Sequence, residues 1–376
     1  MNEPFDLAVV GAGIVGLAHA LAAARLGKKV IVIDREARAN GASIRNFGFI
    51  TVTGQERGDC WRRARRSRDV WAQVAGEADI AIEHTGLVVL LRYPQSLSVA
   101  EAFLETEMGV GCALWTPGEL ARHAPALSGG GALGALWSPH DLRVESRLAL
   151  PRLAAWLEAR WGVTFLSRTA VLSVQPPRIE TSRGPVAATA AVVCPGDDLA
   201  TLFPERIDAQ AVSRCSLSML RLADPGIRLG HAVMSDLSLG RYLGYAALPQ
   251  ARPLCEALAA RQPNHLAHGV HLIVTQSADG SLVVGDSHHY GDTADPFMRG
   301  DIEALILEEF RAATGLAPPP VVERWTGVYA SAAGKTMFVD APGPDVRLVM
   351  VTSGTGASTA FAIGEDVIGE LYGENG

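Results

Sequence analysis

A short glycine-rich segment has the spacing of a turn that binds a dinucleotide. Gly11, Gly13 and Gly16 follow the apolar run 5–10 directly, and a helix-like segment, 17–26, comes next. In such a turn the first glycine allows a sharp bend, the second lets the backbone approach a pyrophosphate, and the third lets helix and strand pack closely. The amino terminus of the helix adds positive potential for the phosphates. The pattern therefore predicts a dinucleotide site.

An acidic residue at the end of the next apolar run completes the pattern. Gly27 is placed to end the helix, residues 29–33 form a second strand-like run, and Asp34 stands 18 residues beyond Gly16. A carboxylate at this position binds ribose hydroxyls. The alternative is a glycine-rich turn in an ordinary α/β fold, and the agreement of the spacing, both strands and the acid weighs against it.

The charge balance argues against a polyanionic partner. The 376 residues include 33 Lys and Arg against 40 Asp and Glu, a formal net charge of −7, so no global field attracts nucleic acid or anionic lipid. The five cysteines are scattered and form no C-x-x-C pair, which indicates neither a disulfide framework nor a structural zinc site. The first residues are acidic and glycines break the apolar stretch after them, so we expect no signal peptide, no membrane span and a cytoplasmic protein.

The elements that must position the dinucleotide site are not consecutive. A nicotinamide-dependent enzyme normally continues through further βαβ units into one sheet, but here a polar loop, 35–48, and an Arg-rich helical segment, 56–74, follow the acid. Strand-like runs suited to a parallel sheet return only at 163–174, 190–196 and 346–352. The sheet is therefore expected to be assembled from separated pieces of chain.

A second set of strand-like runs has no helical crossovers between its members. The runs cover 86–91, 132–137, 216–222 and 241–248, and a hairpin follows at 271–285 with its turn at Asp279-Gly280. They predict a second, mostly antiparallel sheet. The fold class is therefore α/β, with two interleaved domains.

Four motifs spread along the chain carry a resemblance to a known family. They are Val9-Val-Gly-Ala-Gly-Ile-Val-Gly16 with Asp34, Gly41-Ala-Ser43, Val192-Val-Cys-Pro-Gly196, and Ser353-Gly-Thr-Gly-Ala-Ser358. Along nearly its whole length the sequence resembles the FAD-dependent amine oxidoreductases of the D-amino acid oxidase, glycine oxidase and sarcosine oxidase group. The resemblance implies a glutathione-reductase-like, FAD-binding Rossmann domain of residues 1–84, 141–213 and 321–376. It also implies a mostly antiparallel α+β substrate-binding domain, interleaved with the first, of residues 85–140 and 214–320.

The same resemblance implies which residues hold the cofactor. In such proteins the loop equivalent to 41–43 contacts flavin phosphates, and the last glycine-rich turn approaches the pyrimidine ring of the flavin. FAD is expected to be non-covalent, because no cysteine follows Cys255 to match the flavin-linked cysteine of the sarcosine oxidases. The expected cofactor-binding residues are Gly11, Gly13, Ile14, Val15, Gly16, Asp34, Arg35, Ala42, Ser43, Arg45, Asn46, Phe47, Gly48, Val171, Cys194, Gly196, Gly354, Thr355, Gly356, Ala357 and Ser358.

Three further segments are most similar to one branch of this group, the proposed aminophosphonate oxidoreductases. They are 43–48, Gly285-Asp286-Ser287-His288 with Tyr290-Gly-Asp292, and 325–329. The branch implies oxidation of 2-aminoethylphosphonate or a hydroxylated or N-methylated relative. Hydride transfer to flavin N5 would give an imine and then an aldehyde and ammonia, with O2 reduced to H2O2 or another acceptor taking the electrons. The alternative within the family is oxidation of glycine, sarcosine or a D-amino acid.

One departure from the family bears on the substrate. Members that act on α-amino acids carry an arginine that clasps the carboxylate, and the comparable stretch, 326–330, contains none. A phosphonate accepts several donors and does not demand one planar fork. Lys335, Arg45 and Arg241 are the candidates to bind it.

The remaining candidates would line a substrate chamber. Tyr242 and Tyr245 are three apart on an expected strand, so only one of them should face the flavin. A histidine here can orient the substrate amine or accept its proton. His288 and His289 cannot share a side of an extended chain, so at least one has a surface or packing role, and the resemblance favours His288 for the site. His288 and Tyr245 are the catalytic candidates. Arg45, Arg241, Tyr242, Tyr329 and Lys335 are the substrate-binding candidates.

Other readings of the sequence are weaker. His265, His268 and His271 form no helical i, i+4 pair beside an acid, so no metal is expected. A nicotinamide dehydrogenase and a flavoprotein without a substrate pocket remain the alternatives from other classes. The expected partners are a small amine and O2 or another electron acceptor, with no nucleic acid and no membrane, in a monomer or small homo-oligomer.

Overall fold

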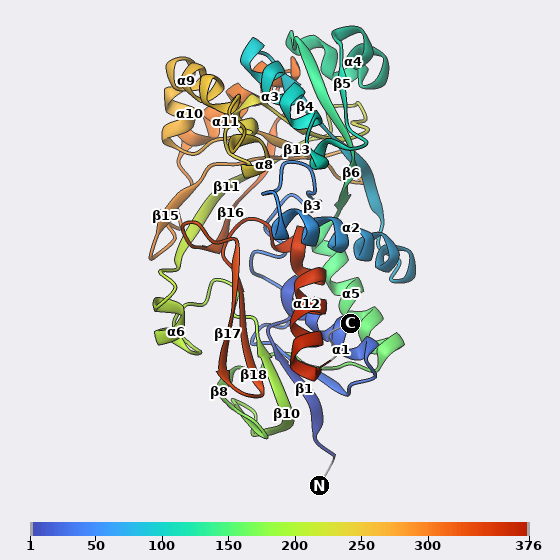
Figure 1. The fold of residues 1–376 in the computed structure, drawn as a ribbon, viewed down its shortest axis with the longest axis vertical. Coiled ribbons are helices and arrows are strands. Elements are labelled where there is room, and N and C mark those ends of the chain that lie inside the picture. Colours follow the sequence, from blue (N-terminus) through green and yellow to red (C-terminus); the bar gives the residue numbers. More distant parts are fainter. Residues whose placement is uncertain (1–2, 374–376) are drawn as a thin grey trace.

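A computed structural model describes residues 3–373, which form two sheets stacked along the long axis of the molecule (Figure 1). The first sheet has the strand order β17-β18-β10-β1-β2-β7. Neighbours from β18 to β7 are parallel, and β17 is antiparallel to β18. The bounds are β1 Phe5–Val10, β2 Val30–Ile33, β7 Thr164–Leu166, β10 Val186–Val193, β17 Met337–Gly343 and β18 Val346–Val351. The prediction of a parallel sheet built from separated segments is confirmed.

The two faces of the first sheet are covered differently. Along β1, Leu7 and Val9 join one core cluster while Ala8 joins another, as the two-residue period of a strand requires. The Leu7 side packs on helices α1 (Ile14–Arg25), α2 (Asp59–Glu77), α5 (Ser146–Trp161) and α12 (Gly356–Tyr372). The Ala8 side packs on the hairpin β8 (Val171–Gln175) and β9 (Arg178–Thr181), and α6 (Pro204–Asp208) adds to this side.

The second sheet has the order β15-β11-β14-β13-β12-β4-β6-β3, with β16 paired to β11 and β5 to β6. Within the described part of this second sheet, β12 and β4 form the one parallel pair of neighbouring strands. The bounds are β3 Phe49–Ile50, β4 Ile82–Leu91, β5 Ala113–Trp115, β6 Gly134–Val144, β11 Ser213–Leu222, β12 Ala232–Met234, β13 Ile273–Gln276, β14 Leu282–Gly285, β15 His289–Gly291 and β16 Val321–Ser331. Its helices are α3 (Pro94–Leu104), α4 (Pro117–His123), α7 (Asp236–Leu239), α8 (Leu243–Ala246), α9 (Ala251–Arg261), α10 (Pro263–Ala267) and α11 (Gly300–Thr314).

The domain boundaries stay a prediction. The expected FAD-binding ranges include β3 and β16, and both strands hydrogen-bond within the second sheet. These two strands therefore belong to the second sheet although they fall within the predicted FAD-binding ranges.

The expected strand at 241–248 is wrong, because this segment contains the short helix α8. Gly244 lies against the backbone of Gly54, where a Cβ would meet main-chain atoms, and its amide donates to the Gly54 carbonyl at 2.9 Å. This close packing of two distant loops overrides the strand-like aromatic pattern.

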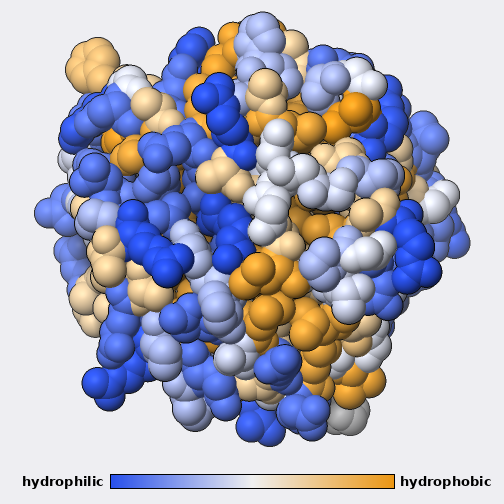
Figure 2. All heavy atoms as spheres, turned by 90° about the horizontal axis from the view of Figure 1, so that it is seen from above, coloured by the Kyte–Doolittle hydropathy of each residue, from blue (hydrophilic) through white to orange (hydrophobic). Residues whose placement is uncertain are grey.

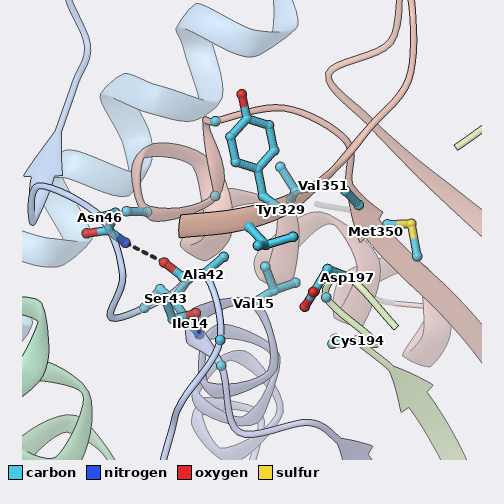
Figure 3. Close-up of a pocket in the computed structure, with 18 of the residues that line it drawn as sticks. Ile14, Val15, Ala42, Ser43, Asn46, Cys194, Asp197, Tyr329, Met350 and Val351 are labelled. Atoms are coloured by element: carbon cyan, nitrogen blue, oxygen red, sulfur yellow. Dashed lines mark hydrogen bonds between the residues drawn. The ribbon is translucent and has the colours of Figure 1, made fainter. Parts of the chain in front are cut away.

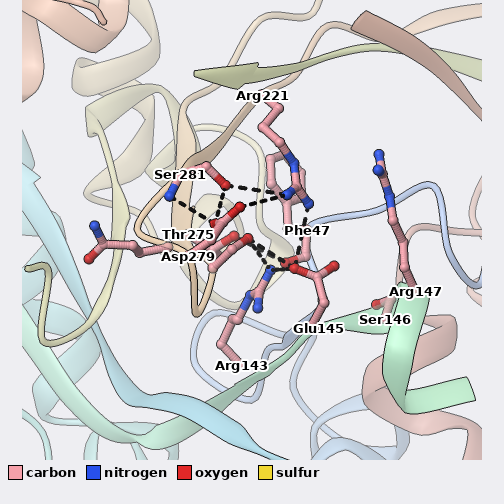
Figure 4. A network of polar contacts seen from close by, with 12 residues as sticks. Phe47, Arg143, Glu145, Ser146, Arg147, Arg221, Thr275, Asp279 and Ser281 are labelled. Carbon is pink, nitrogen blue, oxygen red and sulfur yellow. Dashed lines mark hydrogen bonds and ion pairs between the residues drawn. The ribbon is translucent and has the colours of Figure 1, made fainter. Parts of the chain in front are cut away.

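A buried polar network ties the second sheet to the loop before β3 (Figure 4). Arg143, which is fully buried, donates to Glu145 at 2.9 Å and to Ser277 at 3.1 Å. The hydroxyl of Thr275 donates to the Phe47 carbonyl at 3.0 Å. These bonds hold the loop that carries Phe47 in place beside the cavity described below.

The surface at one end of the molecule mixes polar and apolar side chains (Figure 2). Seen from the end formed by the second sheet and its helices, hydrophilic side chains surround a smaller apolar area (Figure 2). Among residues 3–373, no helix combines the length and the apolar character that crossing a bilayer requires.

Candidate active site

A cavity of about 590 Å³ lies where the two sheets meet. Its walls come from the amino-terminal turn, the loop 39–47, the end of β10, strand β16, and the turn between β18 and α12 (Figure 3). Residues 241–243 and the region around β13 and β14 close it on the side of the second sheet. One cavity therefore joins the predicted cofactor segments to the predicted substrate segments.

The glycine turn is shaped for close backbone approach. Gly11 has a φ of +106°, and a Cβ placed there would lie 2.5 Å from the Cys194 carbonyl oxygen. A Cβ at Gly16 would overlap the Gly11 carbonyl oxygen. Gly13 is the N-cap of α1 and supplies no side chain to cap it, so amide donors of the first turn remain open toward the cavity. Ile14 is an exception, since its amide donates to Ser43 Oγ at 2.9 Å.

Asp34 braces this turn as well as lining the cavity. One carboxylate oxygen accepts from the Ala12 amide at 2.6 Å, and the other accepts from the Glu36 amide at 2.7 Å. Each oxygen keeps a further lone pair for a ligand hydroxyl. The carboxylate thus fixes the glycine turn from the end of β2.

The loop after β2 closes over the turn (Figure 3). The Asn46 amide donates to the Ala42 carbonyl at 2.8 Å, and its oxygen accepts from the Gly48 amide at 2.7 Å. Gly48 does not line the cavity, and a Cβ there would overlap the Val144 carbonyl oxygen. Gly48 therefore allows the loop to pack closely against the Val144 backbone and does not contact a ligand in the cavity.

Most predicted cofactor residues line the cavity, and Gly48 and Ser358 do not. Ser358 instead accepts the Thr51 amide at its Oγ, at 2.8 Å. The predicted residues in the lining are Gly11, Gly13, Ile14, Val15, Gly16, Asp34, Arg35, Ala42, Ser43, Arg45, Asn46, Phe47, Val171, Cys194, Gly196, Gly354, Thr355, Gly356 and Ala357.

The donors that line the cavity fit FAD. The open amino terminus of α1 supplies amides for a pyrophosphate. The amino terminus of α12 also opens on the cavity, and its N-cap Thr355 makes no side-chain capping bond. Two helix amino termini facing one cavity suit a ligand with phosphates at one end and an electron-rich ring at the other.

The substrate side of the cavity gathers charged and titratable groups. Four residues predicted for the substrate chamber line the cavity: Arg241, Tyr242, Tyr329 and His288. The Arg241 guanidinium makes one hydrogen bond among the described residues, from Nη2 to the Tyr290 hydroxyl at 3.0 Å. Most of its donors therefore remain free for a ligand.

Two buried residues that were not among the predicted site residues join this group. His271 precedes β13 and Asp286 follows β14, and both line the cavity. His271 Nε2 lies 3.2 Å from Asp286 Oδ1, and His288 Nε2 lies 3.8 Å from Asp286 Oδ2. The two imidazole rings stack at 5.1 Å between centroids.

Burial dominates the protonation of these groups. Desolvation raises the pKa of Asp286 to about 7, although the nearby Arg241 partly offsets it. Desolvation, with help from neighbouring positive groups, holds the pKa values of His271 and His288 well below 6.5. The histidines are therefore neutral at physiological pH, and Asp286 exchanges its proton there.

Two predicted residues lie away from the cavity. Tyr245 is fully buried against Phe103, with ring centroids 4.7 Å apart, and its hydroxyl has no partner among the described residues. Lys335 is exposed and donates to Gln210 at 2.8 Å. Neither position contacts the chamber, because Tyr245 turns into the core with α8 and Lys335 sits on a surface turn.

Comparison with known proteins identifies the architecture. The sequence model of the family described as FAD dependent oxidoreductase matches residues 6–369. No curated protein matches the chain. Among solved structures, glycine oxidase from Bacillus cereus ATCC 14579 superposes with a TM-score of 0.78 at 15% identity, covering 99% of this chain and 96% of that one.

Two further structures have the same fold. L-proline dehydrogenase from P. horikoshii gives a TM-score of 0.76 at 19% identity, covering 99% of this chain and 94% of that one. Iminodiacetate oxidase from Chelativorans sp. BNC1 gives a TM-score of 0.73 at 18% identity, covering 98% of this chain and 95% of that one. Similarity at these identities establishes the shared fold, and the cofactor assignment comes from the family match.

Proposed function

The chain belongs to the family of FAD-dependent oxidoreductases, and from that premise we propose that it oxidises the carbon–nitrogen bond of a small amine bearing an anionic group. The specific candidate is an aminophosphonate, either 2-aminoethylphosphonate or a hydroxylated or N-methylated relative. Dioxygen or another acceptor then reoxidises the cofactor. The products would be an aldehyde and ammonia.

The residues of the glycine turn, Asp34 and the turn before α12 would hold FAD. When bound, the flavin ring supplies the hydride acceptor for the carbon next to the amine. The chain itself binds, orients and shields the substrate from water, so it needs no nucleophile.

The observation that carries the proposal is the free guanidinium of Arg241 in the substrate chamber. It faces the same chamber as a buried carboxyl, Asp286, so one small ligand can meet a cation at one end and acceptors at the other. The strand stretch 326–330 presents no arginine, so this anion site differs from the carboxylate clasp that the resemblance describes. Arg45 also lines the cavity, but its guanidinium donates to Asn40 at 3.3 Å beside the cofactor loop, so we assign it to the cofactor side.

The test is an anaerobic titration of the purified, FAD-loaded protein followed by its visible spectrum. The ligands are 2-aminoethylphosphonate, its 1-hydroxy and N-methyl derivatives, glycine and sarcosine. Bleaching of the flavin bands by a phosphonate and not by glycine or sarcosine is the expected result. Bleaching by the amino acids alone would refute the phosphonate part, and no bleaching by any amine would refute amine oxidation.

A further inference from the structure

The side chains of His271, Asp286 and His288 converge because of how β13 and β14 end. The His271 amide donates to the Asp286 carbonyl at 3.2 Å, and the Asp286 amide donates to the His271 carbonyl at 3.0 Å. This reciprocal pair places the two residues opposite each other, with side chains on one face. His288 comes two residues after Asp286 and returns to that face. The ligand atoms of the three side chains lie within 4.8 Å of one another.

The Nδ1 nitrogen of each histidine has a hydrogen-bond partner outside the cluster. His288 Nδ1 donates to the Gly269 carbonyl at 3.0 Å, so its Nε2 carries a lone pair. His271 Nδ1 lies 3.3 Å from Ser238 Oγ, whose hydroxyl can donate to the Leu272 carbonyl at 3.4 Å. In the tautomer in which Ser238 donates to Leu272, Ser238 accepts from His271 Nδ1, and His271 Nε2 carries a lone pair.

With Asp286 ionised and His271 in this tautomer, the cluster presents three acceptors to the chamber. Asp286 Oδ1 has no hydrogen-bond partner among the described residues, although it lies 3.2 Å from the Nε2 lone pair of His271. Two acceptors at this separation repel unless a proton or a cation lies between them. The nearest cationic side chain, Arg241, donates to Tyr290 and makes no hydrogen bond to Asp286.

We propose that His271, Asp286 and His288 bind the primary ammonium group of the substrate and that Asp286 removes its proton. The inference rests on the proposed function and narrows it. A primary ammonium offers three N–H donors to the three acceptors, whereas a secondary ammonium offers two and leaves one buried acceptor unpaired. In the proton transfer one N–H bond breaks, one O–H bond forms on Asp286, and the amine becomes neutral with its lone pair free. No electrons are exchanged in this step.

The substrate would then lie across the chamber with its anion on Arg241 and its amine on the cluster. This arrangement fixes the carbon between the two groups without a covalent bond to the chain. Among the compounds named above, 2-aminoethylphosphonate and its 1-hydroxy derivative match it, and N-methyl derivatives match it less well.

The test compares two phosphonates of similar shape in the FAD-loaded protein. The dissociation constant of 2-aminoethylphosphonate comes from the concentration dependence of anaerobic flavin reduction, and that of n-propylphosphonate from the flavin difference spectrum. Asp286→Asn should raise the dissociation constant of 2-aminoethylphosphonate about tenfold or more and lower the limiting rate of flavin reduction. The dissociation constant of n-propylphosphonate should stay within twofold of the wild-type value. His288→Gln should act in the same sense. His289→Gln is the matched control, since His289 pairs with His268 outside the cavity.

Several results would overturn the inference. If Asp286→Asn weakens the binding of both phosphonates equally, Asp286 acts by positioning Arg241 and does not bind the ammonium group. An N-methyl derivative that binds the wild-type protein as tightly as the primary amine would exclude three-donor recognition, and this measurement needs no variant. Uptake of one equivalent of Co2+ by the wild-type protein, lost in Asp286→Asn, would make the cluster a metal site.

The failure of the proposed function gives a different result. If glycine reduces the flavin and phosphonates do not, the same variants are compared with glycine against acetate, and selective loss of glycine binding supports the ammonium site while the phosphonate fails. If no amine reduces the wild-type flavin, the proposed function fails and the inference falls with it. If amines reduce the flavin of the wild-type protein but Asp286→Asn has no selective effect on amine binding, the inference is refuted and the proposed function stands.

Discussion

Three glycines of the cofactor cavity should respond differently to alanine, and the differences separate folding from cofactor binding. At Gly16 a Cβ would overlap the Gly11 carbonyl oxygen and lie 3.0 Å from its carbon, both rigid backbone atoms. At Gly13 it would lie 3.0 Å from Ser43 Oγ, a side-chain atom that can shift. At Gly41, which lines the same cavity, it would meet nothing within 4 Å.

The magnitudes follow from which atoms must move. Gly16→Ala forces helix α1 away from the turn, and overpacking of this kind costs about 3 kcal/mol. With an unfolding entropy of about 0.8 kcal/mol/K for a chain of this length, Tm falls by about 4 °C. Gly13→Ala keeps the fold but blocks the approach of a phosphate to the backbone. Losing one charge-assisted hydrogen bond costs about 2 kcal/mol, which raises the dissociation constant of FAD about thirtyfold.

The assay measures thermal unfolding of the FAD-depleted variants and, separately, their FAD dissociation constants by flavin fluorescence. Gly41→Ala is the control, with Tm within about 1 °C of wild type and FAD affinity within about threefold. A Gly16→Ala protein as stable as the control would refute the packing argument. A Gly13→Ala protein that loses stability but binds FAD normally would refute the assignment of Gly13 to the phosphate site.

Four further outcomes are expected. Arg241→Met should weaken n-propylphosphonate by about tenfold or more in flavin difference spectra and leave FAD affinity unchanged, because the guanidinium lies on the substrate side of the cavity. Burial raises the pKa of Asp286 to about 7, so the folded protein holds this proton between about pH 4 and 7 while the unfolded chain releases it. This group therefore lowers the free energy of unfolding as pH rises through that window, and denaturant titrations at pH 5 and 7.5 should show a smaller decline in Asp286→Asn. Lys335→Met should leave the dissociation constant of 2-aminoethylphosphonate within twofold of the wild-type value, since Lys335 lies on the surface. A larger change would show that Lys335 binds the phosphonate. Tyr245→Phe removes a buried hydroxyl without a partner, so Tm should stay equal or rise in a thermal scan and flavin reduction should stay within twofold; a lower Tm would reveal a hidden partner.

The cofactor turn could be predicted because its determinants are local. Gly11, Gly13 and Gly16 stand within six residues. One helix and one strand, α1 and β2, separate them from Asp34, whose carboxylate contacts the turn. Sequence spacing alone then fixes which backbone atoms approach a ligand. The two sheets also followed from local strand patterns, although their order and the helix at 243–246 depend on contacts between distant segments.

The ammonium cluster could not be predicted in the same way. The regular part of the hairpin pairs Ile273 with Gly285, a register that would put His271 opposite Ser287. The pairing slips by one residue at the end of β14, so His271 meets Asp286 instead, and a one-residue slip exchanges the faces of a strand. The usable signal was the Asp286-Ser-His288 sequence at the end of a predicted hairpin strand, which repeats titratable side chains with a period of two.

The interleaving of the first sheet has a consequence for how the protein is made. Strand β1 pairs with β10, and β10 pairs with β18, so the glycine turn and Asp34 are synthesised long before the strand and turn that complete their cavity. At about 5–20 residues per second the ribosome needs roughly 15–60 s to pass from Asp34 to β18. During that interval β1 can pair with β2, but β10 lacks its partner β18 and the FAD site lacks its last wall. The cofactor cavity can therefore be completed only after the carboxyl-terminal strand has been synthesised.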